Sequence, residues 1–368
     1  MRILHLTSHL NVGGVTRYVL SLSRALAQHG HRVIIAADGG ALEAEAATHG
    51  LAYWRVPLAT SAEFSPRVFR AAHTLAARLR DEPADLIHAH TRVSQVVADR
   101  LSHRFGIPYV TTWHGFFRAG NLGRRLWPCT GALTIAISEP VRRHLLEDFH
   151  LPDARIRLIP HGIDAASCEV PVETSARQQF REEMRLGSNG PVIGTVARLV
   201  ASKGVDQLIR SLPRIRAAVP GASLLIVGDG KERPALERLA AGEGVAEAVR
   251  FAGAVADTRV ALSVMSVFVF LPAEEEGFGL ALLEAMAGGR PIVAVRRGGG
   301  AAWVLEESGV GRLVEPGDPQ ALADAVIWYL QHGEDACRAA GKGRAVVKER
   351  YSLTRMVDQV EAVYRELR

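Results

Sequence analysis

An acidic, glycine-rich segment in the second half of the chain has the residue types of a site for sugars and phosphates. Residues 274–280 directly follow an apolar run, 267–271, and precede a helical stretch that carries Glu284. Carboxylates accept hydrogen bonds from sugar hydroxyls, and free N–H groups at the start of a helix bind phosphate. We therefore expect Glu276 and Glu284 to contact hydroxyl groups, and phosphate to meet the backbone of Gly277, Phe278, Gly279 and Leu280.

Two cations follow an earlier apolar run in the same part of the chain. Arg198 comes two residues after the run 192–196, and Lys203 lies five residues further, next to Gly204. Arginine can bind a phosphate through two parallel hydrogen bonds, and lysine adds a compact positive charge. On charge alone the pair could equally be solvated surface side chains, but its place after a predicted strand favours a diphosphate site.

Paired glycines follow the first apolar run, residues 2–6. Gly13 and Gly14 precede a helical stretch that begins near Thr16, so the backbone there could approach an anion closely. A tight strand-to-helix turn without a ligand explains the same residues equally well. The GxGxxG pattern of dinucleotide sites is incomplete, and Asp38 is the one acidic residue near the end of the second run, so NAD binding is disfavoured.

Short apolar runs alternate along the sequence with amphipathic stretches of helical length. This alternation predicts the strands and helices that position the motifs. This alternation is typical of βαβ units that build a parallel sheet. It occurs in two series, which predict strands at 2–6, 32–36, 51–56, 86–89, 109–112, 133–137 and 156–159, and then at 192–196, 223–227, 249–252, 267–271, 291–295 and 312–314. The sequence therefore predicts an α/β protein with two doubly wound domains.

The domain boundaries follow from a polar stretch, 165–190, that contains no predicted strand. We expect an N-terminal domain of residues 1–168 plus 346–368 and a C-terminal domain of residues 169–345, with the last helix returning to the first domain. Ligands of doubly wound domains bind at the carboxyl ends of strands, so a ligand shared by both domains is expected in a cleft between them.

The composition limits the class of protein. A chain of 368 residues with 48% hydrophobic and 23% charged residues has the composition of a folded protein with two cores. Its three cysteines form no CxxC pair, which argues against a disulfide scaffold or a zinc ribbon and suits a reducing compartment. The N-terminus lacks the pattern of an export signal, and no apolar run has the length of a membrane span. We expect a cytoplasmic protein.

Positive charge is concentrated in residues 1–168, which hold 19 Arg, no Lys and 13 Asp and Glu. Aromatic and basic residues alternate there in Phe116-Phe117-Arg118 and Arg124-Arg125-Leu126-Trp127. This alternation favours peripheral contact with an anionic membrane at its inner face. A loop over a soluble saccharide is the alternative. The arginines are dispersed and belong to no recognised nucleic-acid module, so nucleic-acid binding is not expected.

Taken in order, the motifs resemble those of the retaining glycosyltransferases of family four, which have a GT-B fold. The matching segments span nearly the whole chain: Gly13-Gly14, Ser138-Glu139-Pro140, Pro160-His161-Gly162-Ile163-Asp164, Arg198-Leu199, Lys203-Gly204, Val227-Gly228-Asp229-Gly230, 276–280, 283–287 and Gly317-Asp318. The resemblance implies transfer of a hexose-type sugar from a nucleotide sugar to a saccharide or lipid-linked acceptor, with retention, in polysaccharide or glycolipid biosynthesis.

The resemblance also implies that the N-terminal domain is the acceptor side and the C-terminal domain the donor side, and it implies roles for individual residues. Arg198 and Lys203 would hold the donor diphosphate, Glu276 would contact the transferred sugar, and Glu284 the ribose hydroxyls. Most of the histidines are expected to be structural, but His114 follows a predicted strand and matches the family's histidine near the donor sugar and the acceptor. Backbone contacts to the donor would come from Gly13, Gly14, Gly228, Gly230, Gly253, Gly277, Phe278, Gly279 and Leu280.

Two positions depart from the family pattern, because His161 stands where Asn is usual and Trp303 where Glu is common. The chain has no Asp-x-Asp metal motif and no carboxylate clearly placed as a nucleophile. The implied reaction is therefore a metal-independent, front-face transfer with no cofactor besides the donor substrate. The alternatives are a nucleotide-sugar epimerase and a non-catalytic nucleotide-sugar binding protein. The segment from Glu276 to Glu284 and the intact phosphate residues argue against both.

Overall fold

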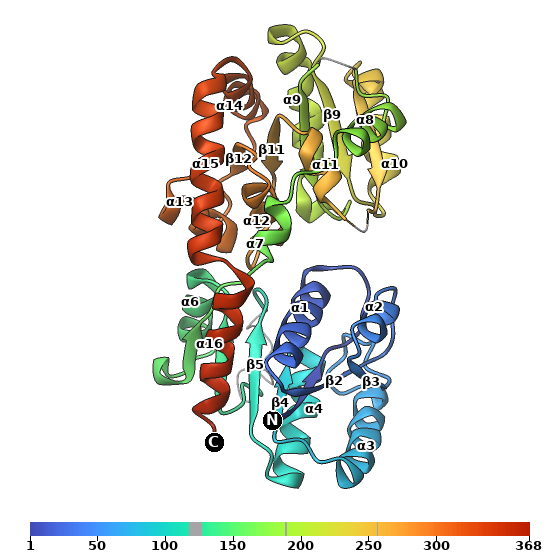
Figure 1. Ribbon diagram of the computed structural model, residues 1–368, viewed down its shortest axis with the longest axis vertical. Coiled ribbons are helices and arrows are strands. Elements are labelled where there is room, and N and C mark those ends of the chain that lie inside the picture. The colour runs from blue at the N-terminus through green and yellow to red at the C-terminus, as the bar shows by residue number, and fades with distance from the viewer. Residues whose placement is uncertain (118–126, 188–189, 256) are drawn as a thin grey trace. The chain divides into compact units, whose positions relative to one another are not determined.

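The computed structural model describes residues 1–368 except 118–126, 188–189 and 256. The chain forms two compact units, one of Met1–Gly162 with Leu353–Arg368 and one of Ile163–Ser352 (Figure 1). Each unit consists of a parallel sheet covered by helices on both faces, so the predicted α/β architecture with two doubly wound domains is confirmed.

The unit boundaries lie a few residues from the expected ones at 168/169 and 345/346. Residues 163–168 belong to the second unit because the helix α7 (Ala165–Glu169) packs on α12 (Leu280–Ala287). The return to the first unit comes later than expected because α15 (Gly333–Arg350) continues without a break.

The first unit has a seven-stranded parallel sheet with the order β3-β2-β1-β4-β5-β6-β7. The strands are β1 (Arg2–Leu6), β2 (Arg32–Ala37), β3 (Ala52–Arg55), β4 (Leu86–Ala89), β5 (Tyr109–Trp113), β6 (Leu133–Ala136) and β7 (Ile156–Leu158). The described helices are α1 (Gly14–Gln28), α2 (Glu43–Thr48), α3 (Pro66–Asp81), α4 (Arg92–Phe105), α6 (Glu139–Glu147), the 3-10 turn η1 (Asp153–Arg155) and α16 (Leu353–Arg365). The strand order reverses between β1 and β4, which is where ligands bind in such sheets.

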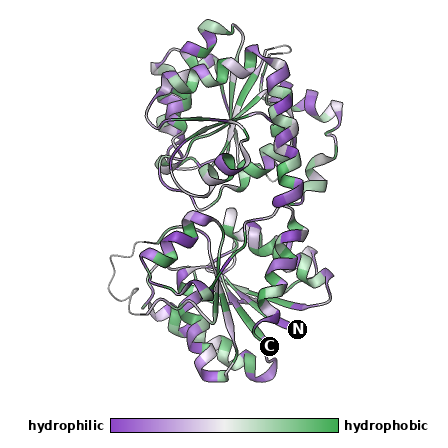
Figure 2. Ribbon diagram, turned by 90° about the vertical axis from the view of Figure 1, so that its left-hand side faces the viewer, coloured by the Kyte–Doolittle hydropathy of each residue, from purple (hydrophilic) through white to green (hydrophobic). Residues whose placement is uncertain are grey.

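Alternate residues of the central strands enter two cores, one on each face of this sheet. Ile3 of β1 packs on the face covered by α1, whereas Leu4 packs on the face covered by α3 and α4. Green predominates along the strands in the hydropathy colouring of Figure 2, as expected for strands buried on both faces. The C-terminal helix α16 packs on α1 through a buried apolar stripe that includes Met356 and Val360, so the predicted return of the chain end is confirmed.

The second unit has a six-stranded parallel sheet with the order β10-β9-β8-β11-β12-β13. The strands are β8 (Val192–Val196), β9 (Ser223–Val227), β10 (Val249–Gly253), β11 (Val267–Phe270), β12 (Ile292–Val295) and β13 (Arg312–Val314). The helices, besides α7, α12 and α15, are α8 (Thr174–Glu183), η2 (Ala201–Lys203), α9 (Val205–Ala218), α10 (Arg233–Gly242), η3 (Ala246–Ala248), α11 (Arg259–Val264), α13 (Gly300–Ser308) and α14 (Pro319–Gln331). Here the order reverses between β8 and β11, and the predicted cationic and acidic motifs follow these two strands.

Candidate functional site

Lys203 and Glu276 meet where the strand order of the second sheet reverses. Lys203 ends the short turn η2 after β8, and Glu276 lies in the loop after β11. The Lys203 ammonium donates to Oε1 of Glu276 at 2.7 Å, with side chains 21% and 24% exposed. The other oxygen, Oε2, is buried and accepts no hydrogen bond from any side chain or backbone group of the described residues. The pair thus joins two residues 73 positions apart and leaves one carboxylate oxygen as an acceptor for a hydroxyl group.

Glycines fix the loops that carry this pair. Gly204 has a φ of +59°, and a Cβ there would lie 2.5 Å from the carbonyl oxygen of Leu271, so only glycine lets the two strand ends approach. Gly299 pairs with Glu276 in a short parallel bridge, and Gly300 N–H donates to the Glu276 carbonyl at 2.8 Å. A Cβ on Gly299, whose φ is +88°, would lie 2.3 Å from that same carbonyl oxygen. The position of Glu276 therefore depends on glycine at two other loops.

Arg198 lies on the same loop as Lys203 and is exposed. Within the part of the chain that the structure describes, its guanidinium forms no ion pair or hydrogen bond. Its neighbour Leu199 is anchored by a backbone hydrogen bond from its N–H to the carbonyl of Asp229 at 2.9 Å. Arg198 thus presents all its donors to solvent from a fixed backbone.

Two of the glycines predicted to contact the donor, Gly228 and Gly230, pack against this loop. A Cβ on Gly228 would lie 1.9 Å from the carbonyl oxygen of Ala197, and one on Gly230 would lie 2.3 Å from that of Leu199. Gly228 N–H also donates to the Gly253 carbonyl at 2.8 Å. Gly228 and Gly230 therefore already have a structural reason to be glycine, independent of any ligand.

Glu284 lies on the second turn of α12, as expected, and accepts a hydrogen bond from the Thr258 hydroxyl at 2.8 Å. It lines a cavity of about 410 Å³ together with Arg177, Arg259 and Arg290. At the start of α12, Gly279 has a φ of +99° and caps the helix, whereas the Phe278 ring is buried and packs edge-on against Tyr351. Any contact of Phe278 with a ligand would therefore come from its backbone.

The first unit carries the other predicted residues. Gly13 is the N-cap of α1, and a Cβ there would meet no described atom within 4 Å, so local packing does not require glycine. His114 directly follows β5 and is half-buried. Its Nδ1 lies 3.2 Å from Nε2 of His161, the residue that departs from the family pattern. The other departure, Trp303, lies in the first turn of α13 and is half-buried.

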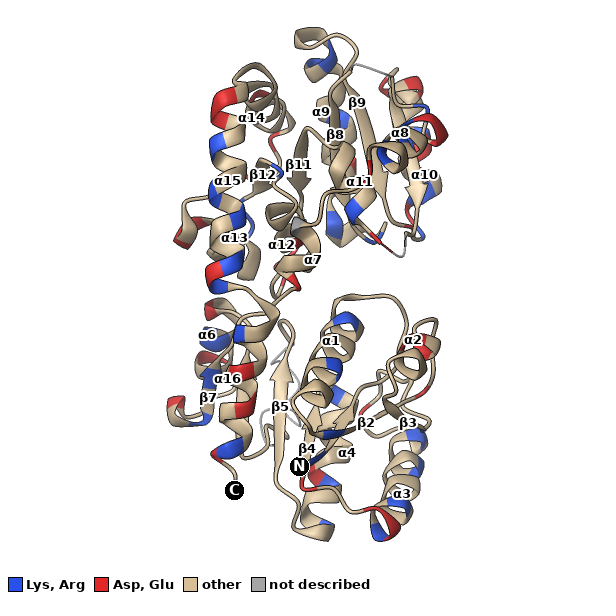
Figure 3. Cartoon of the chain, viewed as in Figure 1, with Lys and Arg blue, Asp and Glu red and all other residues tan. Residues whose placement is uncertain are grey.

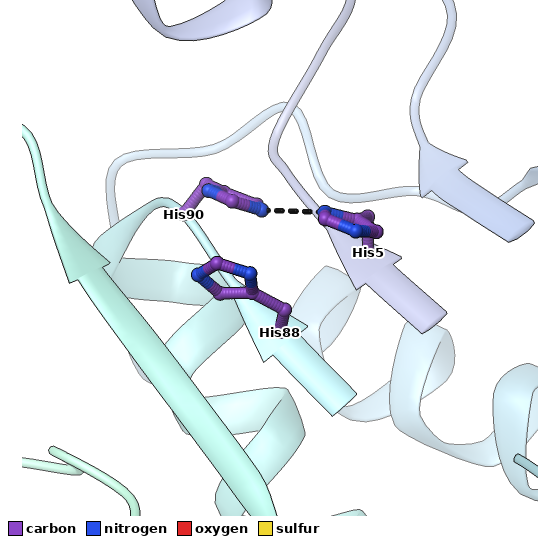
Figure 4. A group of neighbouring side chains, drawn as sticks. All are labelled: His5, His88 and His90. Carbon is purple, nitrogen blue, oxygen red and sulfur yellow. Dashed lines mark hydrogen bonds between the residues drawn. The ribbon is translucent and has the colours of Figure 1, made fainter. Parts of the chain in front are cut away.

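A cluster of histidines around His114 was missed by the sequence analysis. His5 of β1, His88 and His90 at the end of β4, and His161 after β7 are all buried. Nδ1 of His5 lies 2.8 Å from Nε2 of His90, and the three rings of His5, His88 and His90 lie together where β1 and β4 adjoin (Figure 4). The available signal was the spacing of His88 and His90, because residues two apart on a strand face the same side.

Burial keeps these rings uncharged. It lowers the pKa of His5 and of His161 to about 3, and it also holds the pKa of His88, His90 and His114 well below the usual histidine range. A neutral imidazole offers one N–H donor and one acceptor nitrogen. The cluster therefore works by hydrogen bonding and not by positive charge.

The predicted membrane-contact segment is described only in part. Arg118, Arg124, Arg125 and Leu126 lie outside the described residues. Phe117 packs edge-on against Trp113, and the indole N–H of Trp127 donates to Oδ2 of Asp99 at 3.1 Å. Arginines lie on the separate helices α1, α3 and α6 of the first unit in Figure 3. Among the described residues, no helix has both the length and the apolar character needed to cross a membrane.

Comparisons with known proteins agree with both units. Residues 12–167 match the family model described as Glycosyltransferase Family 4, and residues 190–332 match the one described as Glycosyl transferases group 1. Glycogen synthase of Mycobacterium tuberculosis is 30% identical over 374 residues, which cover 90% of this chain and 86% of that protein. A GDP-mannose-dependent α-(1-6)-phosphatidylinositol monomannoside mannosyltransferase of the same organism is 32% identical over 68% of this chain and 64% of its own length.

The fold also matches solved glycosyltransferase structures. Anabaena HepE, solved in complex with UDP-glucose, superposes with a TM-score of 0.87 at 22% identity, covering both chains completely. A glycosyltransferase from Rickettsia africae superposes with a TM-score of 0.89 at 21% identity over 99% of this chain and 98% of its own. The chain thus belongs to the group 1 glycosyltransferases, with an N-terminal domain of the Glycosyltransferase Family 4 type.

Proposed function

We propose that this glycosyltransferase moves a hexose-type sugar from a nucleoside diphosphate sugar to a saccharide or lipid-linked acceptor, with retention and without a metal ion. The observation that carries the proposal is the Lys203–Glu276 pair at the strand reversal of the second sheet, with the exposed Arg198 on the same loop. These residues combine cations for a diphosphate with an acceptor for a sugar hydroxyl.

The departing nucleoside diphosphate gains negative charge as the anomeric bond breaks. Arg198 can bind it through two parallel hydrogen bonds, and Lys203 adds a second positive charge that Glu276 holds in place. The amino end of α12 contributes further N–H groups and partial positive charge. Because fixed cations would supply the stabilisation that a divalent ion provides elsewhere, we propose that the reaction needs no metal.

The two glutamates, Glu276 and Glu284, would accept hydrogen bonds from hydroxyl groups of the donor. Oε1 of Glu276 accepts from Lys203, whereas Oε2 has no hydrogen-bond partner among the described residues, so we assign Oε2 to the transferred sugar. Glu284 is held by a hydrogen bond from Thr258, the N-cap residue of the preceding helix α11, and is assigned to the ribose. Since Glu276 is tied to a cation, it is a weak nucleophile, which supports front-face transfer with retention over a covalent glycosyl-enzyme.

The comparisons support the donor class. The printed name of the mycobacterial mannosyltransferase gives GDP-mannose as donor, and HepE was solved with UDP-glucose. The mannosyltransferase is also named for a phosphatidylinositol-based acceptor. Together with the arginine surplus of residues 1–168, this supports a lipid-linked acceptor at an anionic membrane surface, in polysaccharide or glycolipid biosynthesis.

Release of nucleoside diphosphate tests the proposal. The purified chain is incubated with UDP-glucose, GDP-mannose and other nucleotide sugars, each with a crude acceptor extract and with or without EDTA. We expect release with one donor class, unchanged by EDTA, and a product whose anomeric configuration, read by NMR, matches the donor. Conversion of the donor to another free nucleotide sugar would instead indicate an epimerase, and binding without release a non-catalytic protein.

Matched variants test the site assignment. Arg198→Ala and Glu276→Ala should each lower turnover by about 100-fold or more, as expected for groups that stabilise the transition state. Glu274→Ala, two residues from Glu276 and exposed, is the control and should keep turnover. Unchanged turnover in both site variants would show that the site lies elsewhere.

A further inference from the structure

Four histidine rings of the first unit form a continuous chain of ring-to-ring hydrogen bonds. Nδ1 of His5 lies 2.8 Å from Nε2 of His90, and Nδ1 of His90 lies 3.4 Å from Nε2 of His114. Nδ1 of His114 in turn lies 3.2 Å from Nε2 of His161. This histidine chain runs from His5 in β1 through His90 and the half-buried His114 to the buried His161, which follows β7.

The chemistry of neutral imidazole links the protonation of all four rings. Each ring has one N–H and one bare nitrogen, and each link needs one of each. If His5 carries its proton on Nδ1, then His90, His114 and His161 must also carry theirs on Nδ1. The only other fully bonded arrangement places all four protons on Nε2. The tautomer of His114 is therefore tied directly to that of His90, its neighbour in the histidine chain.

We propose that His90 is a positioning residue for His114, whose tautomer and ring orientation it fixes through the Nδ1–Nε2 hydrogen bond. This inference rests on the proposed function, in which His114 lies near the donor sugar and the acceptor. There, the tautomer decides whether the His114 nitrogens donate or accept. Tyr18 supports the same arrangement, because its ring packs against His114 and His161 with centroid distances of 4.8 and 4.7 Å.

His88 supplies a matched control. It is as buried as His90 and lies at the same strand end, and the centroids of the two rings are 4.1 Å apart. However, His88 is not a member of the hydrogen-bonded histidine chain. Its Nδ1 lies 2.6 Å from the Tyr364 hydroxyl and its Nε2 lies 2.7 Å from the Thr112 hydroxyl. Replacing His88 therefore disturbs the same core without breaking a link to His114.

A metal site is the competing explanation for three of these rings. His5, His88 and His90 each have a nitrogen within 4.8 Å of the others. However, both nitrogens of His88 and of His90 already have hydrogen-bond partners, and of these three rings only His5 has a nitrogen, Nε2, without a partner among the described residues. Hydrogen bonding therefore accounts for the ring nitrogens that a metal ion would need. Measurement of the metal content of the purified protein separates the two explanations.

Two substitutions of His90 separate its two links. The Asn amide stands where Nδ1 stands, so His90→Asn keeps a group facing His114 and loses the one facing His5. The Gln amide stands where Nε2 stands, so His90→Gln keeps the group facing His5 and loses the one facing His114. The two variants are similar in size and polarity, so a purely structural role predicts the same outcome for both.

The experiment combines ¹⁵N NMR of histidine-labelled full-length protein with donor turnover. In the wild type we expect one shared tautomer for His5, His90, His114 and His161. His114 should become a tautomer mixture in His90→Gln, with kcat lowered about 10-fold or more at an unchanged KM for the donor. His90→Asn should keep kcat within about 3-fold of the wild type, and His88→Gln should keep both the tautomer and kcat.

Distinct outcomes would overturn the inference. Mixed tautomers in the wild type, one bound metal ion per chain, or equal losses in His90→Asn and His90→Gln would each do so. The wild-type spectrum needs no substitution, so the test stands even if a variant fails to fold. A wild-type protein that turns over no nucleotide sugar would refute the proposed function instead, while the NMR spectra would still decide whether His90 sets the tautomer of His114.

Discussion

The ammonium of Lys203 lies 2.7 Å from Oε1 of Glu276 and thereby joins the loops after β8 and β11, the two strands between which the order of the second sheet reverses. Each side chain is about three-quarters buried, so solvent screens the attraction less than at an open surface. The pair both holds the loops together and keeps a cation and a carboxylate in fixed positions.

Removal of one partner should therefore affect the other. Lys203→Ala should lower kcat by about 100-fold, because it removes a diphosphate contact and frees the Glu276 carboxylate to move. Lys203→Arg should recover part of the activity because it keeps the charge. Steady-state kinetics check this, with Lys231→Ala, an exposed lysine of the same unit, as control. Equal activity of Lys203→Ala and Lys231→Ala would contradict the assignment.

Substitution of Gly299 should displace Glu276 through the backbone. Gly299→Ala places a methyl group 2.3 Å from the Glu276 carbonyl oxygen at a φ of +88°. We expect it to lower the free energy of unfolding by about 1–3 kcal/mol and to reduce turnover. Gly341→Ala, in the middle of α15, places a Cβ where no side chain or other element of the described residues lies within 4 Å, and it should instead raise the free energy of unfolding by about 0.4–1 kcal/mol. Urea denaturation of both variants measures the two changes in the free energy of unfolding, which should have opposite signs. A destabilised Gly341→Ala variant would contradict the prediction.

The buried histidines should make the protein sensitive to acid. The pKa of His5 and of His161 is about 3 in the folded protein, against about 6.5 in an unfolded chain. Between these values the unfolded state binds more protons, so stability falls as the pH falls from about 6.5 towards 3. Each such histidine contributes a slope of about 1.4 kcal/mol per pH unit.

Urea midpoints measured at pH 7, 6 and 5 check this dependence. His5→Gln should show a shallower decline than the wild type because one of the titrating groups is gone. His332→Gln, which removes an exposed histidine of the second unit, should decline like the wild type. Identical slopes in His5→Gln and the wild type would show that acid sensitivity arises elsewhere.

Contact with anionic membranes is the fourth prediction. The arginine surplus of residues 1–168 should produce co-sedimentation with vesicles that contain anionic lipid at low salt, and high salt should weaken it. Vesicles of neutral lipid are the control. Equal sedimentation with both kinds of vesicle, or none with either, would leave a saccharide acceptor without a membrane as the better assignment.

The sequence by itself determined the architecture and the position of the donor-side residues along it. Buried parallel strands are apolar throughout and alternate with amphipathic helices, so the number of strands and their order along the chain follow from local periodicity. Since ligands bind after the carboxyl ends of such strands, Arg198, Lys203 and Glu276 could be placed at one edge of a sheet before any contact was known.

Only the tertiary structure decided which residues touch. Lys203 and Glu276 are 73 positions apart, and His5 and His90 are 85 apart. Their meeting depends on the strand orders that place β8 beside β11 and β1 beside β4. Periodicity is a local signal that reports which residues face a core, but not which strands become neighbours. The histidine chain therefore became visible only in the folded protein, where four strand ends converge.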